Sequence, residues 1–328
     1  MKRLFILIMF VILYSHLYPQ VYKAEHPLTH TYSIVARDEI TGEMGVAVQS
    51  HWFSVGSVVS WGEAGVGVIA TQSFSNVSFG VRGLELLKNG LSPQQALDSL
   101  LSDDEGSEYR QVAILDAKGR VAAHTGNKCI QDAGHITGDN FSVQANLMLN
   151  DKVCPAMEKA FKETKGPLAE RMAGALKAAQ EAGGDIRGKQ SAAILVVKGE
   201  STGKIWQDRL IDLRVEDHPA PVEEIIRLLK VHRAYEHMNA GDLAVEKGDM
   251  ELAMKEYSTA EEMFPGNLEM KYWHAVTLAN NGKVEDSLPM FKEIFSKDKN
   301  WKILTPRLTK NGLLNVKEGE LQKILEAD

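Results

Sequence analysis

The residues TYSIVA at 31–36 and MGVAVQ at 44–49 decide the fold of the first half of the chain. Both runs are rich in the β-branched and apolar residues that favour strands. The segment RDEITGE between them contains turn-forming residues. The two runs therefore predict a β-hairpin whose first strand begins at Thr31.

Further strand and helix signals continue from this hairpin to about Asp217. Strands are predicted at 58–61, 66–71, 111–115, 120–124, 141–147, 192–197 and 209–214. Ser92, Pro93 and Gln95 form a capping-box helix start, and two more helices are predicted at 152–163 and 167–181. Hairpin-linked strands with consecutive helices predict an α+β domain over residues 30–217, with mostly antiparallel sheets covered by helices.

The second half changes composition after Pro219 and Pro221, becoming rich in Glu, Lys, Leu and Met with helical periodicity. Residues 218–234 predict a linker helix, and residues 235–328 an all-α domain with an internal repeat of 34 residues. The first copy has Gly241, Gly248, Ala253, Tyr257, Ala260 and Pro265. The second copy has Ala275, Gly282, Ser287, Phe291, Ile294 and Lys299.

This spacing resembles the tetratricopeptide repeat, which implies a module that binds a partner protein. The alternative is that two repeats only cap the first domain or mediate self-association. That alternative stays open because fewer than three repeats have little stability of their own.

The N-terminus has Lys2 and Arg3 before an apolar run at residues 4–14. This arrangement is typical of a secretory signal peptide, which we expect over residues 1–24. The run is shorter than the roughly 20 residues that a membrane-spanning helix needs, although an uncleaved anchor is the alternative. The sequence therefore predicts export to the periplasm or the medium.

The bulk properties exclude some classes of protein. A chain of 328 residues with 44% hydrophobic and 25% charged content is typical of a soluble globular protein. A net charge of −7 without a basic cluster argues against a nucleic-acid partner. Cys129 and Cys154 could form one disulfide or remain thiols, and their spacing does not suggest a metal site. No dinucleotide or phosphate-binding motif is present, so no cofactor is expected.

Seven segments together resemble one known family, domain of unknown function 1028. They are HTYSIVARD (30–38), GVAVQS (45–50), AGVGVIATQS (64–73), RGLELL (82–87), RQVAILD (110–116), AAHTG (122–126) and GGDIRGKQSAAILVV (183–197). That family is assigned to the N-terminal-nucleophile (Ntn) hydrolase-like fold. The resemblance implies a four-layer αββα sandwich, in agreement with the order of strands and helices.

The resemblance also implies a catalytic residue. In Ntn hydrolases the first residue of the mature domain attacks an amide carbonyl, and its own α-amine acts as the base, with a pKa of about 8. By position this residue is Thr31. A free amine at Thr31 requires cleavage after His30, whereas signal peptidase would cut further upstream. If His30 stays attached, this mechanism is blocked.

Other candidate site residues lie at strand ends and in loops, where sites are usually built. An Ntn site also needs polar groups for the oxyanion, and Gln72, Asn76, Gln144 and Asn146 could supply them. Asp185 with Arg187 could hold a substrate carboxylate. The candidates for substrate binding are Ser50, His51, Thr71, Gln72, Asn76, His124, Gln144, Asn146, Asp185 and Arg187.

These observations favour an exported Ntn-type hydrolase that cleaves an amide bond of a small molecule or peptide, with Thr31 as nucleophile. The alternative is a non-catalytic envelope protein whose sandwich domain holds a ligand and whose repeats bind a partner protein. A purely structural envelope protein is a third reading. Fold-level analogy also suggests a homodimer.

Overall fold

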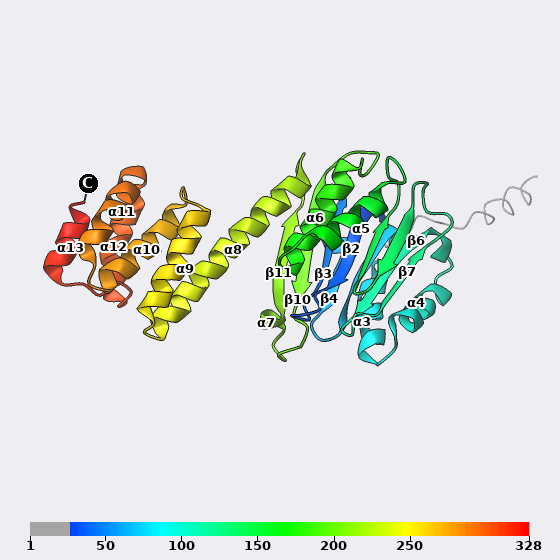
Figure 1. Cartoon of the computed structure of the whole chain (residues 1–328), viewed down its shortest axis with the longest axis horizontal. Helices are drawn as coiled ribbons and strands as arrows, with labels where there is room; N and C mark the ends of the chain where they lie inside the picture. Colours follow the sequence, from blue (N-terminus) through cyan, green and yellow to red (C-terminus); the bar gives the residue numbers. More distant parts are fainter. Residues whose placement is uncertain (1–26, 328) are drawn as a thin grey trace, which may run out of the picture. The chain divides into compact units, whose positions relative to one another are not determined.

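The computed structural model describes residues 27–327. The chain divides into two compact units after Ile226 (Figure 1). The first unit is a mixed α+β domain with antiparallel sheets, as predicted, and the second is helical. The predicted signal peptide lies outside the described residues.

The predicted hairpin forms the centre of a six-stranded sheet. Its strand order is β11-β10-β3-β2-β9-β8, and all neighbours are antiparallel. The Asp38 carboxylate accepts hydrogen bonds from the backbone N–H groups of Ile40 and Thr41, which fixes the turn between β2 and β3. The strands are β2 (Thr31–Arg37), β3 (Met44–Ser50), β8 (Gly134–Gly138), β9 (Phe141–Ala145), β10 (Ser191–Val197) and β11 (Arg209–Val215).

A second sheet has five strands in the order β1-β5-β6-β7, and β4 also pairs with β5. These pairings are antiparallel too. The strands are β1 (Leu28–Thr29), β4 (Ser60–Glu63), β5 (Gly67–Phe74), β6 (Arg110–Asp116) and β7 (Val121–Thr125).

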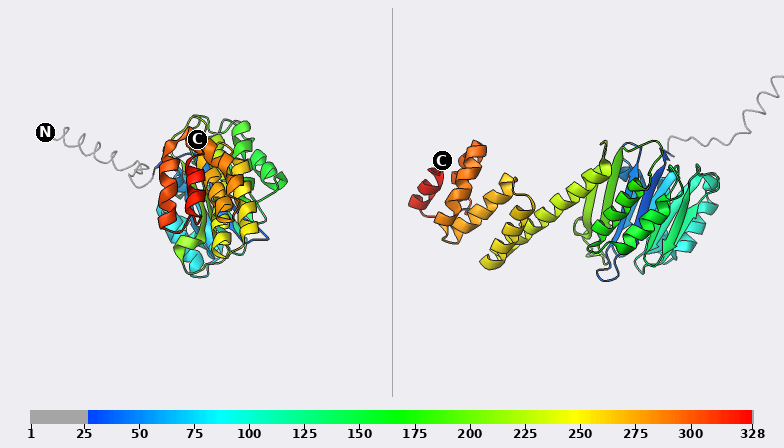
Figure 2. Two further views of the ribbon diagram at one scale, coloured as in Figure 1. Left: turned by 90° about the vertical axis from the view of Figure 1, so that its left-hand side faces the viewer. Right: turned by 45° about the horizontal axis from the view of Figure 1, so that its top comes forward.

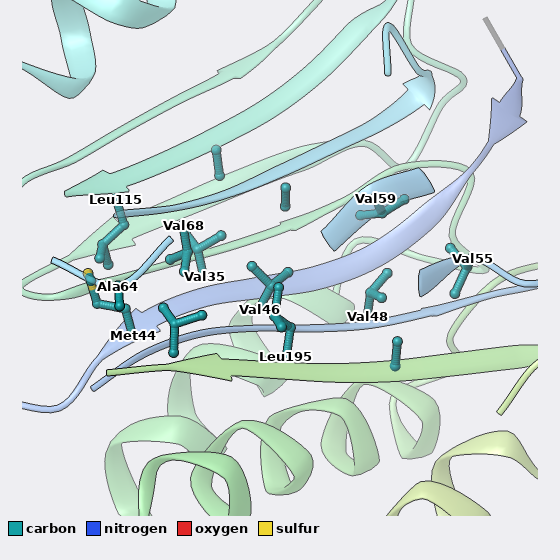
Figure 3. Close-up of a cluster of buried hydrophobic side chains, with 14 residues drawn as sticks. Val35, Met44, Val46, Val48, Val55, Val59, Ala64, Val68, Leu115 and Leu195 are labelled. Carbon is teal, nitrogen blue, oxygen red and sulfur yellow. The ribbon is translucent and has the colours of Figure 1, made fainter. Parts of the chain in front are cut away.

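The two sheets share one apolar core (Figure 3). Alternate residues of each strand point into it, as the two-residue period of a strand requires. Val46 and Val48 enter from β3, and Val68 and Leu115 enter from β5 and β6. At about 25 cal/mol per Å², burial of such side chains is the main stabilising contribution to this unit.

Helices cover the outer faces of both sheets. Helices α3 (Ser78–Lys88) and α4 (Pro93–Ser102) pack on the five-stranded sheet through a second apolar cluster. Helices α5 (Val153–Glu163) and α6 (Leu168–Glu181) cover the six-stranded sheet (Figure 1). Gly45 makes room for α6, because a Cβ atom there would collide with the Met172 side chain.

The prediction of a strand at 58–61 was wrong in its first half. The chain forms the helical turn α2 (Gly56–Val59) before β4 begins. Val55 and Val59 lie one turn apart and both enter the core between the sheets, so their burial outweighs the strand preference of the valines. Strands β1 and β8 and helix α3 were not predicted. Another short helix, α7 (Ile205–Asp208), precedes β11.

The second unit consists of the larger part of α8 (Pro221–Glu246), from Arg227 onward, and five further helices (Figure 2). Helix α8 continues without a break through the predicted linker and the first helix of the predicted repeat. The other helices are α9 (Met250–Met263), α10 (Leu268–Asn280), α11 (Val284–Lys297), α12 (Lys299–Lys310) and α13 (Glu318–Leu325). Within residues 27–327, no helix combines the length and apolar character needed to cross a membrane.

A close approach between α8 and α9 gives a first prediction. A Cβ atom at Gly241 would lie 2.7 Å from the Tyr257 ring, which is 2% exposed and cannot swing away. We expect Gly241→Val to lower the free energy of unfolding by about 1–3 kcal/mol. Urea titration followed by circular dichroism measures this change. Gly266→Val is the matched control, because a Cβ atom there meets no atom within 4 Å. Equal effects of the two substitutions would contradict the prediction.

Candidate functional site

Thr31 opens β2 at the end of the six-stranded sheet where three hydroxyl side chains come into register. Thr31 pairs with Ser50 of β3, and Ser50 pairs with Ser191 of β10. All three residues are fully buried. Because neighbouring strands are antiparallel, the start of β2 and β10 meets the end of β3. The hairpin register therefore brings the predicted candidates Thr31 and Ser50 together.

The carbonyl group of His30, which precedes Thr31, is held by two donors. The Ser50 Oγ hydroxyl donates to it over 2.6 Å, and Arg187 Nη2 donates over 2.8 Å. One donor is a hydroxyl and the other is cationic. This is the arrangement that stabilises negative charge developing on a carbonyl oxygen.

Arg187 is held in place by Asp185, two residues earlier in the loop between α6 and β10. Arg187 Nε and Nη2 donate to the two carboxylate oxygens over 3.0 and 2.7 Å. The Asp185 side chain is 0% exposed and that of Arg187 is 28% exposed. The carboxylate also accepts the backbone N–H of His51. A bidentate pair of this kind fixes the direction of the guanidinium group.

The segment before Thr31 is part of the folded site. Residues Leu28–Thr29 form β1 on the edge of β5, with Leu28 opposite Phe74 and Thr29 opposite Ser73. The backbone N–H of Ser75 donates to the Pro27 carbonyl over 3.0 Å. The Thr31 hydroxyl donates to the Thr29 carbonyl over 2.6 Å, so its oxygen lies beside the His30–Thr31 peptide.

The His30 side chain fills a closed space and is 3% exposed. Its Nδ1 lies 2.7 Å from Asn146 Oδ1, and its ring meets the Phe74 ring edge-on at 5.3 Å. Asn146 Nδ2 donates to Gln111 and to the Thr31 carbonyl, so Asn146 Oδ1 is the acceptor and His30 Nδ1 carries the proton. Burial lowers the pKa of His30, which favours the neutral ring.

A network of buried amides lies between the sheets next to Thr31. Gln72 Nε2 donates to the Thr31 carbonyl and to Gln111, and the Gln72 carbonyl oxygen accepts from the Ser33 hydroxyl. Gln144 Nε2 donates to Ser33. The backbone N–H of Asn146 also donates to the Thr31 carbonyl. These bonds satisfy polar groups that would be costly to bury alone, and they fix the backbone at Thr31.

The other predicted candidates occupy different positions. Thr71 donates to the Asn76 carbonyl, and the Asn76 side chain accepts from Ser78 at the start of α3. His124 lies in β7 with Nε2 3.0 Å from the Ser107 carbonyl. Within the described residues 27–327, the side chains of Thr71, Asn76 and His124 form no hydrogen bond with Thr31 or His30. Their hydrogen bonds stabilise nearby turns and the start of α3, and do not place them in the cluster around Thr31.

Ser33 and Gln111 belong to the network but were not among the predicted site residues. Ser33 lies two residues before Val35 in β2, and Gln111 lies two residues before Ala113 in β6. Their side chains therefore point to the same face as these two core residues. A polar residue at an inward position near a strand end is the signal that could have found them.

The two cysteines are free thiols in this structure. Burial raises the pKa of Cys129, and raises that of Cys154 to about 12. Both are therefore weak nucleophiles at neutral pH. Across residues 27–327, no group of three or more His, Cys, Asp or Glu side chains is arranged to hold a metal ion.

Two open cavities of the first unit lie at the opposite end of the strands. One, of about 550 Å³, is lined by residues that include Arg37, Thr41 and Lys198. The other, of about 700 Å³, includes Lys118 and Asn140. Strand β2 separates that end from Thr31 by six residues, or about 20 Å at the rise of a strand. The polar cluster at Thr31 is thus separate from both cavities.

The fold and the site define a class: an α+β protein with a threonine at the start of a central strand, inside a buried polar cluster. The chain belongs to the DUF1028 family, a family of unknown function, which matches residues 31–225. It is similar to the crystal structure of protein SPO2555 from Silicibacter pomeroyi, described with the same family. The two chains are 30% identical with a TM-score of 0.56, over 62% of this chain and 88% of that one. No curated protein matches the sequence.

Proposed function

We propose that the protein is an exported hydrolase of the Ntn type that cleaves an amide bond of a small molecule or peptide, with Thr31 as nucleophile. The observation that carries the proposal is the His30 carbonyl, held by Ser50 and Arg187 beside the Thr31 hydroxyl. A peptide bond in this setting is ready for attack, because its oxygen already faces a hydroxyl donor and a cation.

The fold supports this proposal in two ways. The two antiparallel sheets share a core and carry helices on their outer faces, which is the layering of an αββα sandwich. Thr31 is the first residue of a central strand, the position that the Ntn nucleophile occupies. Export would follow from a signal peptide over residues 1–24.

The chemistry would begin on the protein itself. The Thr31 Oγ attacks the His30 carbonyl carbon, a C–O ester bond forms, the C–N bond breaks, and the Thr31 nitrogen takes up a proton as its amine. Water then hydrolyses the ester and releases the residues before Thr31. The freed amine can act as the base for Thr31 in a second reaction, the attack on the carbonyl of a substrate amide.

Mass spectrometry of the N-terminus of the purified full-length protein tests this proposal. We expect a mature chain that begins at Thr31. We expect Ser50→Ala to slow the cleavage by about 10²–10³-fold, since it removes one of the two donors to the carbonyl. Ser191→Ala is the matched control, because Ser191 is buried opposite Ser50 on β10. Its hydroxyl accepts the Val55 N–H and donates to the Trp52 carbonyl, not to the His30 carbonyl. A mature chain that begins upstream of Thr31 would exclude the free-amine mechanism.

We also propose that the helical unit is a tetratricopeptide-like module that binds a partner protein. Tyr257 and Phe291, at equivalent repeat positions, are both buried. Gly248 and Gly282 have positive φ angles of 74° and 73° between successive helices, a conformation that glycine adopts without strain.

A non-catalytic binding protein is the second candidate. Strand β1 packs against β5 directly before Thr31, and the Thr31 hydroxyl is engaged by the Thr29 carbonyl. These contacts would also suit a permanent structural role. The mass of the mature N-terminus separates the two candidates, because a binding protein does not need cleavage between His30 and Thr31.

A further inference from the structure

The residues that precede Thr31 lie in the site as the acyl side of a substrate would. They end at a carbonyl held by Ser50 and Arg187, run along a sheet edge, and place one ring in a closed space. We infer that the site takes extended peptides, that they add as an edge strand to β5, and that the residue before the cleaved bond carries a ring with an N–H donor. This inference rests on the proposed function.

The backbone contacts define the direction of the bound peptide. On one edge of β5 lies β6, and on the other edge β4 pairs with residues 67–70 while β1 pairs with residues 73–74. Departure of residues 27–30 would expose the β5 edge near Ser73 and Phe74. An extended peptide can add to such an edge through main-chain hydrogen bonds in the same antiparallel register.

The His30 side chain defines the specificity. Its ring contacts Phe74 edge-on, and its Nδ1–H donates to Asn146 Oδ1. Because the Asn146 amide nitrogen is engaged by Gln111 and the Thr31 carbonyl, the amide cannot turn to offer a donor. The space therefore favours a neutral ring with a donor over a small or charged side chain.

Charge around this space acts against a cationic residue. The Arg187 guanidinium lies next to the His30 carbonyl, while Asp185 is already paired with it. A lysine side chain in place of His30 would have to give up its water close to Arg187 without a free anionic partner. Alanine would lose the ring contact with Phe74 and the hydrogen bond to Asn146 Oδ1.

The test uses the purified full-length protein and N-acetylated peptides Pro-Leu-Thr-Xaa linked to aminomethylcoumarin, with His, Ala or Lys as Xaa. We expect kcat/KM for the His peptide to exceed that for the other two by about 10–100-fold, the range expected when a shaped, hydrogen-bonding pocket loses its ligand. Phe74→Ala should reduce the preference for His over Ala, and Thr31→Ala should abolish hydrolysis of all three.

The outcomes test the hydrolase proposal and the inferred peptide specificity separately. Equal cleavage of the three peptides would overturn the inferred specificity. Thr31-dependent hydrolysis of small p-nitroanilides without cleavage of any peptide would overturn the inferred substrate class and leave the hydrolase proposal standing. Absence of Thr31-dependent hydrolysis of both kinds of substrate would overturn both.

Discussion

Replacing Thr31 by valine should leave the chain uncut between His30 and Thr31 and lower the proposed amide hydrolysis by at least about 10³-fold, as loss of the nucleophile does in known hydrolases. Valine keeps the branched shape of threonine and lacks the hydroxyl that would attack the carbonyl. The expected loss is therefore chemical. Intact-mass analysis measures the cleavage, and release of a chromophore from an amide substrate measures the hydrolysis.

Two further variants separate chemistry from folding. Thr31→Ser keeps a hydroxyl at the same atom and should retain cleavage, whereas Thr41→Ala changes an exposed threonine in the β2–β3 turn and should change neither rate. Normal cleavage in Thr31→Val would rule out Thr31 as the nucleophile.

The sequence could predict the strand that begins at Thr31 because its signal is local, whereas the role of Thr31 came from the family resemblance. The β-forming residues in TYSIVA and MGVAVQ, with turn residues between them, predict a hairpin, and the hairpin register places Thr31 opposite Ser50. The paired helices and the capping box at Ser92 were confirmed for the same reason. Each depends on residues within a few positions of one another.

The rest of the site depends on contacts between distant residues. Arg187 reaches the His30 carbonyl across 157 positions, and Gln111 reaches Asn146 across 35. Among the predicted oxyanion donors, Gln72 and Asn146 bond to the Thr31 carbonyl, not to that of His30. Local patterns do not say which of several polar strand-end residues will face a given carbonyl. Strand β1 was not predicted because its two residues are too few to show the alternating pattern of a strand.

Arg187→Met should have the second largest effect, and on two quantities at once. It removes the cationic donor to the His30 carbonyl, so cleavage should slow by about 10²–10³-fold. It also leaves the fully buried Asp185 carboxylate without its charged partner, so the free energy of unfolding should fall by about 3–5 kcal/mol. Intact-mass time courses and urea titrations measure the two effects.

A double variant tells these effects apart. Adding Asp185→Asn to Arg187→Met removes the unpaired charge while the amide oxygen can still accept the backbone N–H of His51 or of residue 187. The double variant should recover most of the lost stability but none of the lost rate, because no cation then faces the His30 carbonyl. If cleavage returned together with stability, Arg187 would only support the fold, and the charge at the carbonyl would have no part in the reaction.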